Sequence, residues 1–201
     1  MKRSFEFITA VLGIVALSPI LLAVAALIKG GSDGPVFYRG MRVGLDGKAF
    51  RIFKFRTMVF NADKIGGSST ADGDSRVTSI GRILRKYKLD ELPQLLNVLA
   101  GDMSFVGPRP QVEEDVAKYT DKERAILSVR PGITDWSSIR FRDEGAILAG
   151  HRDPDQAYVD LIRPEKIRLQ LLYVREMSFC TDLKILWATG VALLGGEVKL
   201  P

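Results

Sequence analysis

The stretch of sequence that decides the fold is KLDELPQLLNVLAGDMSFVGPRP, residues 88–110. Its leucines recur at helical spacing and define one apolar face: Leu92, Leu95, Leu96 and Leu99. Pro93 fits only the first turn of this helix, because its missing N–H costs nothing there. Asp90 and Glu91 are therefore predicted at the helix N-terminus, where unpaired amides and the helix dipole favour ionised carboxylates and phosphate binding. From this placement alone, Asp90 is either a nucleophile or an ordinary helix cap.

A second chemical feature is the turn Gly107-Pro108-Arg109-Pro110, which cannot continue a helix. Pro110 biases Arg109 toward an extended backbone, so the turn holds the guanidinium out on a stiff loop. The planar fork of N–H donors on a guanidinium suits a phosphate group. A surface arginine in a proline-rich turn is the alternative interpretation of the same residues.

The composition limits which partners, catalytic groups and metal ions the chain can use. The chain has 201 residues, which suits one compact domain with an appendage. Its net charge of +5 fits an anionic partner: nucleic acid, anionic lipid or a phosphorylated substrate. One histidine, His151, and one cysteine, Cys180, are too few for a zinc site or for Ser-His or Cys-His catalysis, and we expect Cys180 to be buried. Oxygen ligands, and hence Mg²⁺, are the remaining choice for a metal.

The N-terminal part of the chain predicts a membrane anchor. An apolar run, residues 5–28, follows Lys2 and Arg3 and is long enough to cross a bilayer. Basic residues also follow the run, so both flanks favour the cytoplasmic side. Pro19 removes a backbone hydrogen bond near the middle of the run, and the Ser18 hydroxyl can satisfy the freed groups. The sequence therefore predicts a bent, re-entrant helix in preference to a straight span or a signal peptide.

The domain division follows from the linker at residues 30–35: a re-entrant membrane helix in 1–29 and a cytosolic catalytic domain in 30–201. The expected fold class is α+β, with a compact, mostly helical domain, a small β-hairpin and interfacial amphipathic helices. The hairpin turn is predicted at Asp46-Gly47, followed by a strand over 48–58. Helices are expected in these segments: 79–87 with Ser79 as its cap, 111–119, a helix opened by a capping box at 120–123, 165–177 and 183–194.

The run from Asp74 to Pro110 resembles the core signature of the bacterial sugar transferases, the monotopic phosphoglycosyl transferases. The resemblance includes the Asp-Glu pair and the Pro-Arg-Pro turn. It implies that a UDP-sugar donates its phosphosugar to polyprenyl (undecaprenyl) phosphate with release of UMP, as the first membrane step of glycoconjugate or polysaccharide synthesis. It also implies a monotopic protein on the cytosolic face of the bacterial inner membrane, in contact with anionic lipids.

The same resemblance implies residue roles. Asp90 is the expected nucleophile and forms an aspartyl-phosphosugar intermediate. Glu91, with Asp90, is expected to hold Mg²⁺. A set of basic and turn residues is expected to bind the substrate: Lys54, Arg56, Arg76, Arg85, Pro108, Arg109 and Pro110.

Two other functions stay open at this point. A metal-dependent nucleotide-sugar glycosyltransferase would use Asp72-Gly73-Asp74, in the loop of residues 61–75, and would release UDP. A non-catalytic membrane-surface adaptor or a nucleic-acid binder would not need the Asp-Glu pair, so we expect no nucleic-acid partner. The sequence names neither the sugar nor the polyprenol, and it leaves a homodimer open. A subgroup with its own sugar or lipid preference is predicted from residues around a departure from the family pattern: Asp135, Trp136, Arg140 and Arg142.

Overall fold

The computed structural model describes residues 2–62, 65 and 70–201, and its class is α+β, as predicted. The helices are α1 (Lys2–Gly31), α2 (Ser79–Lys86), α3 (Leu95–Ala100), α4 (Glu113–Val116), α5 (Trp136–Arg140), α6 (Glu144–Leu148), α7 (Pro154–Ala157), α8 (Arg163–Glu176) and α9 (Phe179–Leu193). Tighter 3₁₀ turns are η1 (Leu45–Gly47), η3 (Leu89–Gln94) and η4 (Glu123–Ser128), and η5 (Tyr158–Ile162) is a π-helical turn. The strands are β1 (Phe37–Tyr38), β2 (Met41–Val43), β3 (Ala49–Arg51), β4 (Lys54–Phe55), β5 (Ser104–Val106) and β6 (Gly132–Thr134).

The strands form small separate pairs. β2 and β3 make the predicted antiparallel hairpin around Asp46-Gly47, β1 pairs antiparallel with β4, and β5 pairs parallel with β6. The single strand predicted over 48–58 is wrong, because the chain divides into β3 and β4. Between them the Phe53 amide donates to the Asn97 side-chain oxygen at 2.8 Å, so the backbone leaves the hairpin ladder to meet α3.

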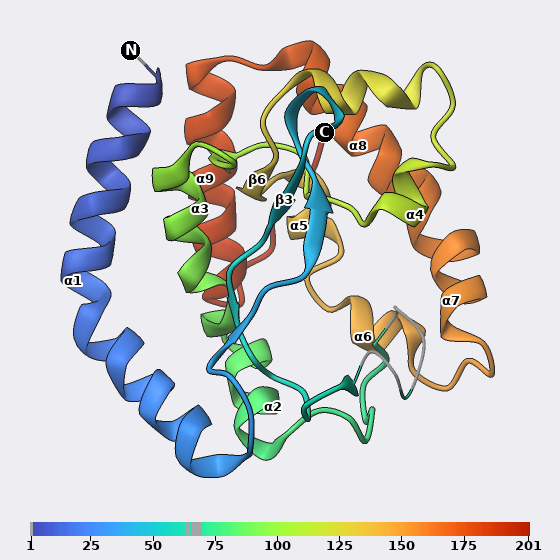
Figure 1. Cartoon of the computed structure of the whole chain (residues 1–201). Helices are drawn as coiled ribbons and strands as arrows, with labels where there is room; N and C mark the ends of the chain where they lie inside the picture. The colour runs from blue at the N-terminus through green and yellow to red at the C-terminus, as the bar shows by residue number, and fades with distance from the viewer. Residues whose placement is uncertain (1, 63–64, 66–69) are drawn as a thin grey trace.

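The anchor segment is a single long helix, α1, with Pro19 inside it. Figure 1 shows α1 running down one side of the molecule and changing direction about halfway along. Pro19 cannot donate to the Val15 carbonyl one turn back, and the Ser18 hydroxyl donates to that carbonyl instead, at 2.8 Å. The predicted break at Ser18-Pro19 is therefore a bend with its backbone satisfied. Among the described helices, α1 is the one long and apolar enough to cross a membrane.

The start of α1 is attached to the rest of the protein by its basic residues. Arg3 donates to the carbonyls of Val98 and Leu99 at the end of α3, at 2.5 and 2.9 Å. The Val98 carbonyl also accepts from the amide of the capping residue Gly101 at 3.2 Å, so Arg3 supplements the cap and adds a favourable charge at the helix C-terminus. Lys2 forms an ion pair with Asp182 on α9 at 2.7 Å.

Glu6 lies in the apolar run yet is buried, and it accepts a hydrogen bond from the Ser104 hydroxyl on β5. The inward side of α1 also contributes to the core along both of its halves. One cluster joins the first half to the hairpin and α3: Ala10, Ile52, Val98 and Met103. Another joins the second half to β4 and α2: Val24, Ile28, Phe55 and Leu84. The anchor and the domain therefore share their core.

The outward side of α1 is apolar and exposed, with Leu12, Val15 and Leu22 between 63% and 71% exposed. This surface continues onto α9, because the rings of Phe5 and Phe179 meet edge to face with their centroids 6.2 Å apart. α9 adds its own exposed apolar residues: Leu183, Leu186, Trp187 and Leu193.

Several predicted helices need correction. The cap of α2 is Thr78, whose hydroxyl accepts from the Gly81 amide, and not Ser79. The helix predicted over 111–119 is limited to the single turn of α4. Cys180 is exposed on α9 and not buried, because it lies on the outward side of that helix near its start.

Other helix predictions are confirmed. The backbone amide of Thr120 donates to the Glu123 carboxylate at 2.7 Å, and the Glu123 amide donates back to the Thr120 hydroxyl at 3.3 Å. This is the predicted capping box, although the turn that it opens, η4, is 3₁₀ and not α-helical. The helices predicted over 165–177 and 183–194 are α8 and α9, although α8 begins two residues and α9 four residues before the predicted start.

Candidate active site

The acidic pair lies in the first turn of η3, just before α3, as the leucine spacing predicted. Pro93 lies inside this turn, which is 3₁₀ and not α-helical, and the α-helix itself begins at Leu95. Lys88 precedes the turn in the left-handed conformation, with φ of 55°. Asp90 is buried with 7% of its surface exposed, and its Oδ1 has no hydrogen-bond partner in the described part of the chain.

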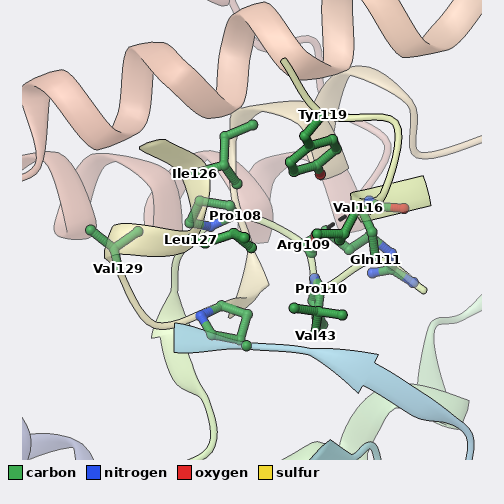
Figure 2. A pocket seen from close by; sticks show the side chains of 12 residues that line it. Val43, Pro108, Arg109, Pro110, Gln111, Val116, Tyr119, Ile126, Leu127 and Val129 are labelled. Carbon is green, nitrogen blue, oxygen red and sulfur yellow. Dashed lines mark hydrogen bonds between the residues drawn. The ribbon is translucent and has the colours of Figure 1, made fainter. Parts of the chain in front are cut away.

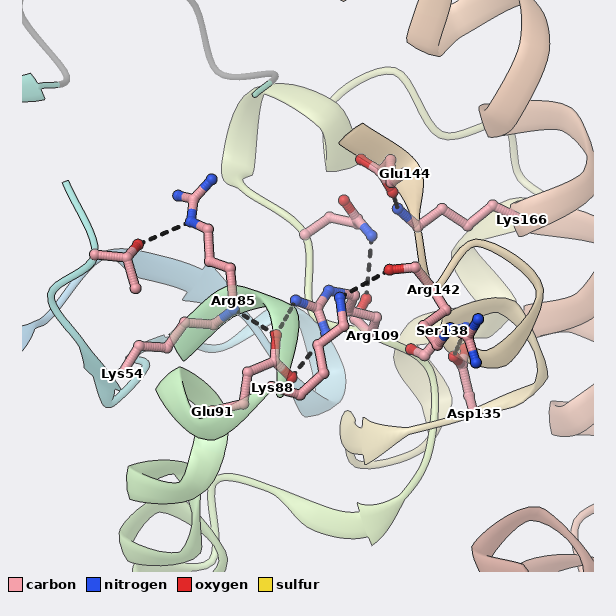
Figure 3. Close-up of polar contacts among 12 residues, drawn as sticks. Lys54, Arg85, Lys88, Glu91, Arg109, Asp135, Ser138, Arg142, Glu144 and Lys166 are labelled. Carbon is pink, nitrogen blue, oxygen red and sulfur yellow. Dashed lines mark hydrogen bonds and ion pairs between the residues drawn. The ribbon is translucent and has the colours of Figure 1, made fainter. Parts of the chain in front are cut away.

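Glu91 is held by two cations from distant parts of the sequence (Figure 3). Lys54, on β4, lies 2.7 Å from Glu91 Oε1. The Arg109 guanidinium donates to both carboxylate oxygens, at 2.5 and 3.2 Å. Lys54 and Arg109 lie 37 and 18 residues from Glu91 in the sequence, and β4 and the loop after β5 bring them next to it. This bidentate geometry is the strong form of a guanidinium–carboxylate contact.

The two adjacent acids have opposite pKa shifts. Burial raises the pKa of Asp90, although the charges of Lys54, Arg85 and Arg109 act in the other direction. Burial also acts to raise the pKa of Glu91, but Arg109 and Lys54 outweigh it and hold that pKa well below its ordinary value. The helix N-terminus was expected to favour an ionised Asp90, and at this site desolvation is the larger effect. Neighbouring carboxyl groups with separated pKa values suit separate chemical roles.

Arg85 reaches the same site from α2. Its Nε donates to the Thr57 hydroxyl at 2.9 Å, at the end of the segment that contains β4. The close approach of α2 requires Gly81, because a Cβ there would lie 2.0 Å from the Thr57 carbonyl oxygen. Thr57 is 7% exposed and has no charge, so no sequence pattern indicated its contact with Arg85.

Arg109 is presented by a loop whose prolines face an apolar pocket (Figure 2). Pro108 and Pro110 line this pocket together with Val43, Val116, Tyr119 and Ile126. The Pro108 carbonyl accepts from the Gly132 amide at 3.0 Å, so the loop continues the pairing of β5 with β6. The predicted stiff turn is therefore packed on its apolar side while its guanidinium points to Glu91.

Two arginines predicted to bind the substrate contact other partners, although the charges of Arg76 and Asp74 act on the pKa of Arg85. Arg56 is buried, and its guanidinium donates to three linker carbonyls, those of Ser32, Asp33 and Pro35, at 2.5 to 2.9 Å. Arg76 holds both carboxylate oxygens of Asp74, with the shortest contact at 2.7 Å. A substrate role for Arg56 and Arg76 stays a prediction.

The described residues offer no protein-only metal site. Within residues 2–62, 65 and 70–201, no group of three or more His, Cys, Asp or Glu side chains is placed to hold a metal ion. In the Asp72-Gly73-Asp74 motif, the contact with Arg76 lowers the pKa of Asp74 and occupies its carboxylate. Asp90 and Glu91 fit Mg²⁺ only in the manner common beside phosphates, where one or two carboxylates act together with substrate oxygens.

A second ion pair, which the sequence did not predict, lies beside Arg109 in Figure 3. Lys166 on α8 is 6% exposed and lies 3.0 Å from the Glu144 carboxylate. The Tyr158 ring lies 4.9 Å from the Lys166 ammonium group. A separation of 22 residues gave no spacing signal for this pair.

The sequence profile of the bacterial sugar transferases matches residues 1–196. The chain belongs to the bacterial sugar transferase family. It is 37% identical over 200 residues to a UDP-N-acetylgalactosamine-undecaprenyl-phosphate N-acetylgalactosaminephosphotransferase of Aeromonas hydrophila, covering 98% of this chain and 44% of that protein. It is 38% identical to the uncharacterized sugar transferase EpsL of Bacillus subtilis, covering 98% of this chain and 89% of the relative.

A third relative of this sugar transferase is the UDP-glucose:undecaprenyl-phosphate glucose-1-phosphate transferase of Escherichia coli, at 37% identity over 94% of the chain and 39% of the relative. The transferase thus spans less than half the length of the Aeromonas and Escherichia proteins.

Proposed function

We propose that this sugar transferase moves a phosphosugar from a UDP-sugar to undecaprenyl phosphate and releases UMP. The observation that carries the proposal is the environment of Asp90. Its carboxylate is buried, one oxygen has no partner among the described residues, and Lys54, Arg85 and Arg109 act on it electrostatically. Relatives that are named for transfer of sugar phosphates from UDP-sugars to undecaprenyl phosphate support the same reaction.

The proposed chemistry has two displacements at one phosphorus atom. An Asp90 carboxylate oxygen attacks the phosphorus that carries the sugar, and the bond from that phosphorus to the bridging oxygen breaks. UMP leaves with the bridging oxygen and the electron pair. A phosphate oxygen of undecaprenyl phosphate then attacks the aspartyl-bound phosphorus, forming the lipid diphosphate sugar and regenerating the Asp90 carboxylate.

The burial of the site and its cations indicate what each of its residues does in the proposed reaction. The raised pKa of Asp90 reflects a poorly solvated carboxylate, which is a stronger nucleophile once ionised than one surrounded by water. Arg85 and Arg109 bind phosphate oxygens and offset the charge that develops on them. Glu91 keeps Lys54 and Arg109 in place through its hydrogen bonds to both.

We propose Mg²⁺ as the cofactor, held by Asp90 and Glu91 only when the donor diphosphate supplies further oxygens. When bound, the ion neutralises diphosphate charge. Because Lys54 and Arg109 already occupy Glu91, Mg²⁺ alone is expected to bind weakly. Calorimetry with Mg²⁺ in the absence and presence of UDP measures this dependence.

We also propose a monotopic position on the cytosolic face of the bacterial inner membrane, with α1 re-entrant. The start of α1 contacts Asp182 and Ser104, and its second half packs on Phe55 and Leu84. A helix that crossed the bilayer would separate its ends by a hydrocarbon core of about 30 Å. Contacts of both ends with one domain therefore favour a helix that returns to the side it left.

The position of α1 is testable by labelling. In a Cys180→Ser background, which removes the exposed native thiol, single Ser4→Cys and Gly31→Cys variants are treated in intact cells with an impermeant thiol reagent. A re-entrant helix leaves both thiols protected until the cells are opened. Labelling of one thiol from outside would show a spanning helix instead.

The experiment that tests the reaction is intact-protein mass measurement after incubation with a panel of UDP-sugars and Mg²⁺, without lipid acceptor. A mass increase equal to one phosphosugar, mapped by proteolysis to Asp90, is the expected result and identifies the donor. Turnover on addition of undecaprenyl phosphate, but no adduct with any donor, would indicate direct transfer. Release of UDP in place of UMP would indicate a glycosyltransferase.

A further inference from the structure

Lys88 has an unusual backbone for its residue type. It is the residue from which the chain enters η3, and its φ of 55° places it in the left-handed region. Residues with a Cβ rarely adopt this region, and glycine adopts it without a steric cost. A lysine at this position therefore suggests that its side chain has a function that glycine cannot supply.

The Lys88 side chain is attached to a distant part of the fold. Its ammonium group donates to the backbone carbonyl of Arg142 at 2.8 Å, across 54 residues of sequence (Figure 3). Arg142 in turn donates through its guanidinium to the Ala192 carbonyl in the last turn of α9. Asp143 contacts the other side of that guanidinium at 3.2 Å. Two hydrogen bonds thus join the residue before η3 to the end of α9.

The two ends of this link differ in character. Asp90 lies two residues after Lys88 in the same turn, and its Oδ1 has no hydrogen-bond partner within residues 2–62, 65 and 70–201. At the other end, α9 presents Trp187, 77% exposed, and Leu194, just after the helix, 92% exposed. Exposed apolar side chains of this kind suit the lipid interface. The link therefore joins the acidic turn to the apolar surface that α9 shares with α1.

We propose that Lys88 is a positioning residue for Asp90, and that the Lys88–Arg142–Ala192 link fixes the acidic turn relative to the end of α9. This role of Lys88 rests on the proposed function in one respect, because it requires that Asp90 reacts with the donor. The link holds the Asp90 carboxylate where both the donor phosphate and the membrane-bound acceptor can reach it. Misplacement of a reacting group by about 1 Å costs up to 100-fold in rate, so loss of the link lowers kcat.

The first test compares substitutions at position 88 in the full-length chain, with undecaprenyl phosphate in liposomes and the UDP-sugar that forms the adduct. Lys88→Met removes the hydrogen bond and is expected to lower kcat about tenfold, with KM for both substrates nearly unchanged. Lys88→Arg keeps a donor and is expected to restore most of kcat. Lys86→Met, at an exposed neighbouring lysine, is the matched control and leaves kcat unchanged.

The Lys88→Gly variant distinguishes the effect of the lysine side chain from the effect of the left-handed backbone conformation. Glycine accepts the left-handed conformation, so this variant folds at least as stably as Lys88→Met, yet it lacks the hydrogen bond. The proposal requires Lys88→Gly to lose kcat as Lys88→Met does. Wild-type kcat in Lys88→Gly, or a loss in Lys88→Met that appears only in KM or in thermal stability, overturns it.

A second measurement does not depend on activity. Amide hydrogen exchange of Lys88→Met is expected to be faster than wild type in residues 89–94 and 140–143, with the core of α8 unchanged. Unchanged exchange in residues 89–94 overturns the link even if the proposed reaction is correct. If the wild-type protein turns over no UDP-sugar, the proposed reaction fails, and the exchange result still decides the link.

Discussion

The acidic turn, residues 88–94, and the acidic loop, residues 71–76, both place acids close to a guanidinium, and they differ in how far away the partner lies in the sequence. In the loop, Asp74 pairs with Arg76, two residues away. In the turn, Glu91 pairs with Lys54 and Arg109, 37 and 18 residues away. The pair of Asp74 with Arg76 joins two residues of the same loop. The distant pairs gather several chain segments around one carboxylate.

The first acids of the two regions differ in burial, whereas the paired acids do not. Asp72 is exposed, but Asp90 is 7% exposed and its Oδ1 has no partner in the part of the chain that the structure describes. The side chains of Asp74 and Glu91 are 14% and 13% exposed. A buried carboxylate without a partner is unfavourable for folding, and such groups are concentrated at functional sites. An Asp-x-Asp spacing therefore carries less information about chemistry than the desolvation of one aspartate.

The largest expected effect is loss of turnover in Asp90→Asn. The amide keeps the shape of the side chain but cannot displace UMP, so kcat is expected to fall on the order of 10⁴- to 10⁶-fold. Assay of UMP release measures it, and a circular dichroism spectrum like that of wild type establishes that the fold is intact. Activity within tenfold of wild type would reassign Asp90 to a cap or to a metal ligand.

The next effect is loss of stability in Glu91→Gln. Removal of this carboxylate leaves Lys54 and Arg109 partly buried without their counter-charge, which is expected to cost about 3–5 kcal/mol. Denaturant unfolding of the two proteins in the same detergent measures the difference. If the loss is below about 1 kcal/mol, the cluster is not a structural centre.

The pH dependence of this loss has a defined sign. Glu91 has a lowered pKa in the folded protein, so its contribution is present above its ordinary value of 4.5. It is lost as the pH falls through the folded-state pKa. The stabilities of wild type and Glu91→Gln are therefore expected to converge in acid.

A smaller effect is expected in the pH profile of catalysis. Burial raises the pKa of Asp90, and the proposed nucleophile must be ionised. The value of kcat/KM is therefore expected to fall with decreasing pH from a point above the ordinary aspartate pKa of 3.8. Steady-state rates from pH 4 to pH 8 test this, and a profile flat down to about pH 4 would contradict it.

The smallest effect is expected in the acidic loop. Asp72→Asn, an acid-to-amide change matched to the two above, is expected to change stability by less than about 0.5 kcal/mol. It is also expected to leave the Mg²⁺ dependence of turnover unaltered. Loss of metal-dependent activity in this variant would revive the glycosyltransferase with an Asp-x-Asp metal site.

The features predicted from the sequence are those that depend on local chemistry. Pro19 predicts the bend of α1, and Thr120 and Glu123 form their capping box because both contacts lie within four residues. The acidic pair was placed correctly because the leucine spacing fixes the start of its helix. Each of these needs no knowledge of the tertiary structure.

The features that were not predicted depend on contacts across the fold. Arg56 and Lys54 are two residues apart on similar backbone, yet one contacts the linker carbonyls and the other contacts Glu91. The sequence also gave no sign that Lys88 is left-handed, since that conformation goes with a hydrogen bond to Arg142. Glu6 did carry a signal, because an acid in an apolar membrane segment usually faces a protein partner.

Glu6 also sets an order of events during synthesis. Its partner, Ser104, is made 98 residues later. At about 5–20 residues per second, the ribosome needs roughly 5–20 s to supply that partner. During this interval Glu6 has neighbours only in the part of the chain already made, such as Lys2, whose ammonium group lies 4.0 Å from its carboxylate in the folded protein. The contact that joins the start of α1 to β5 therefore forms only after the chain has been made as far as β5.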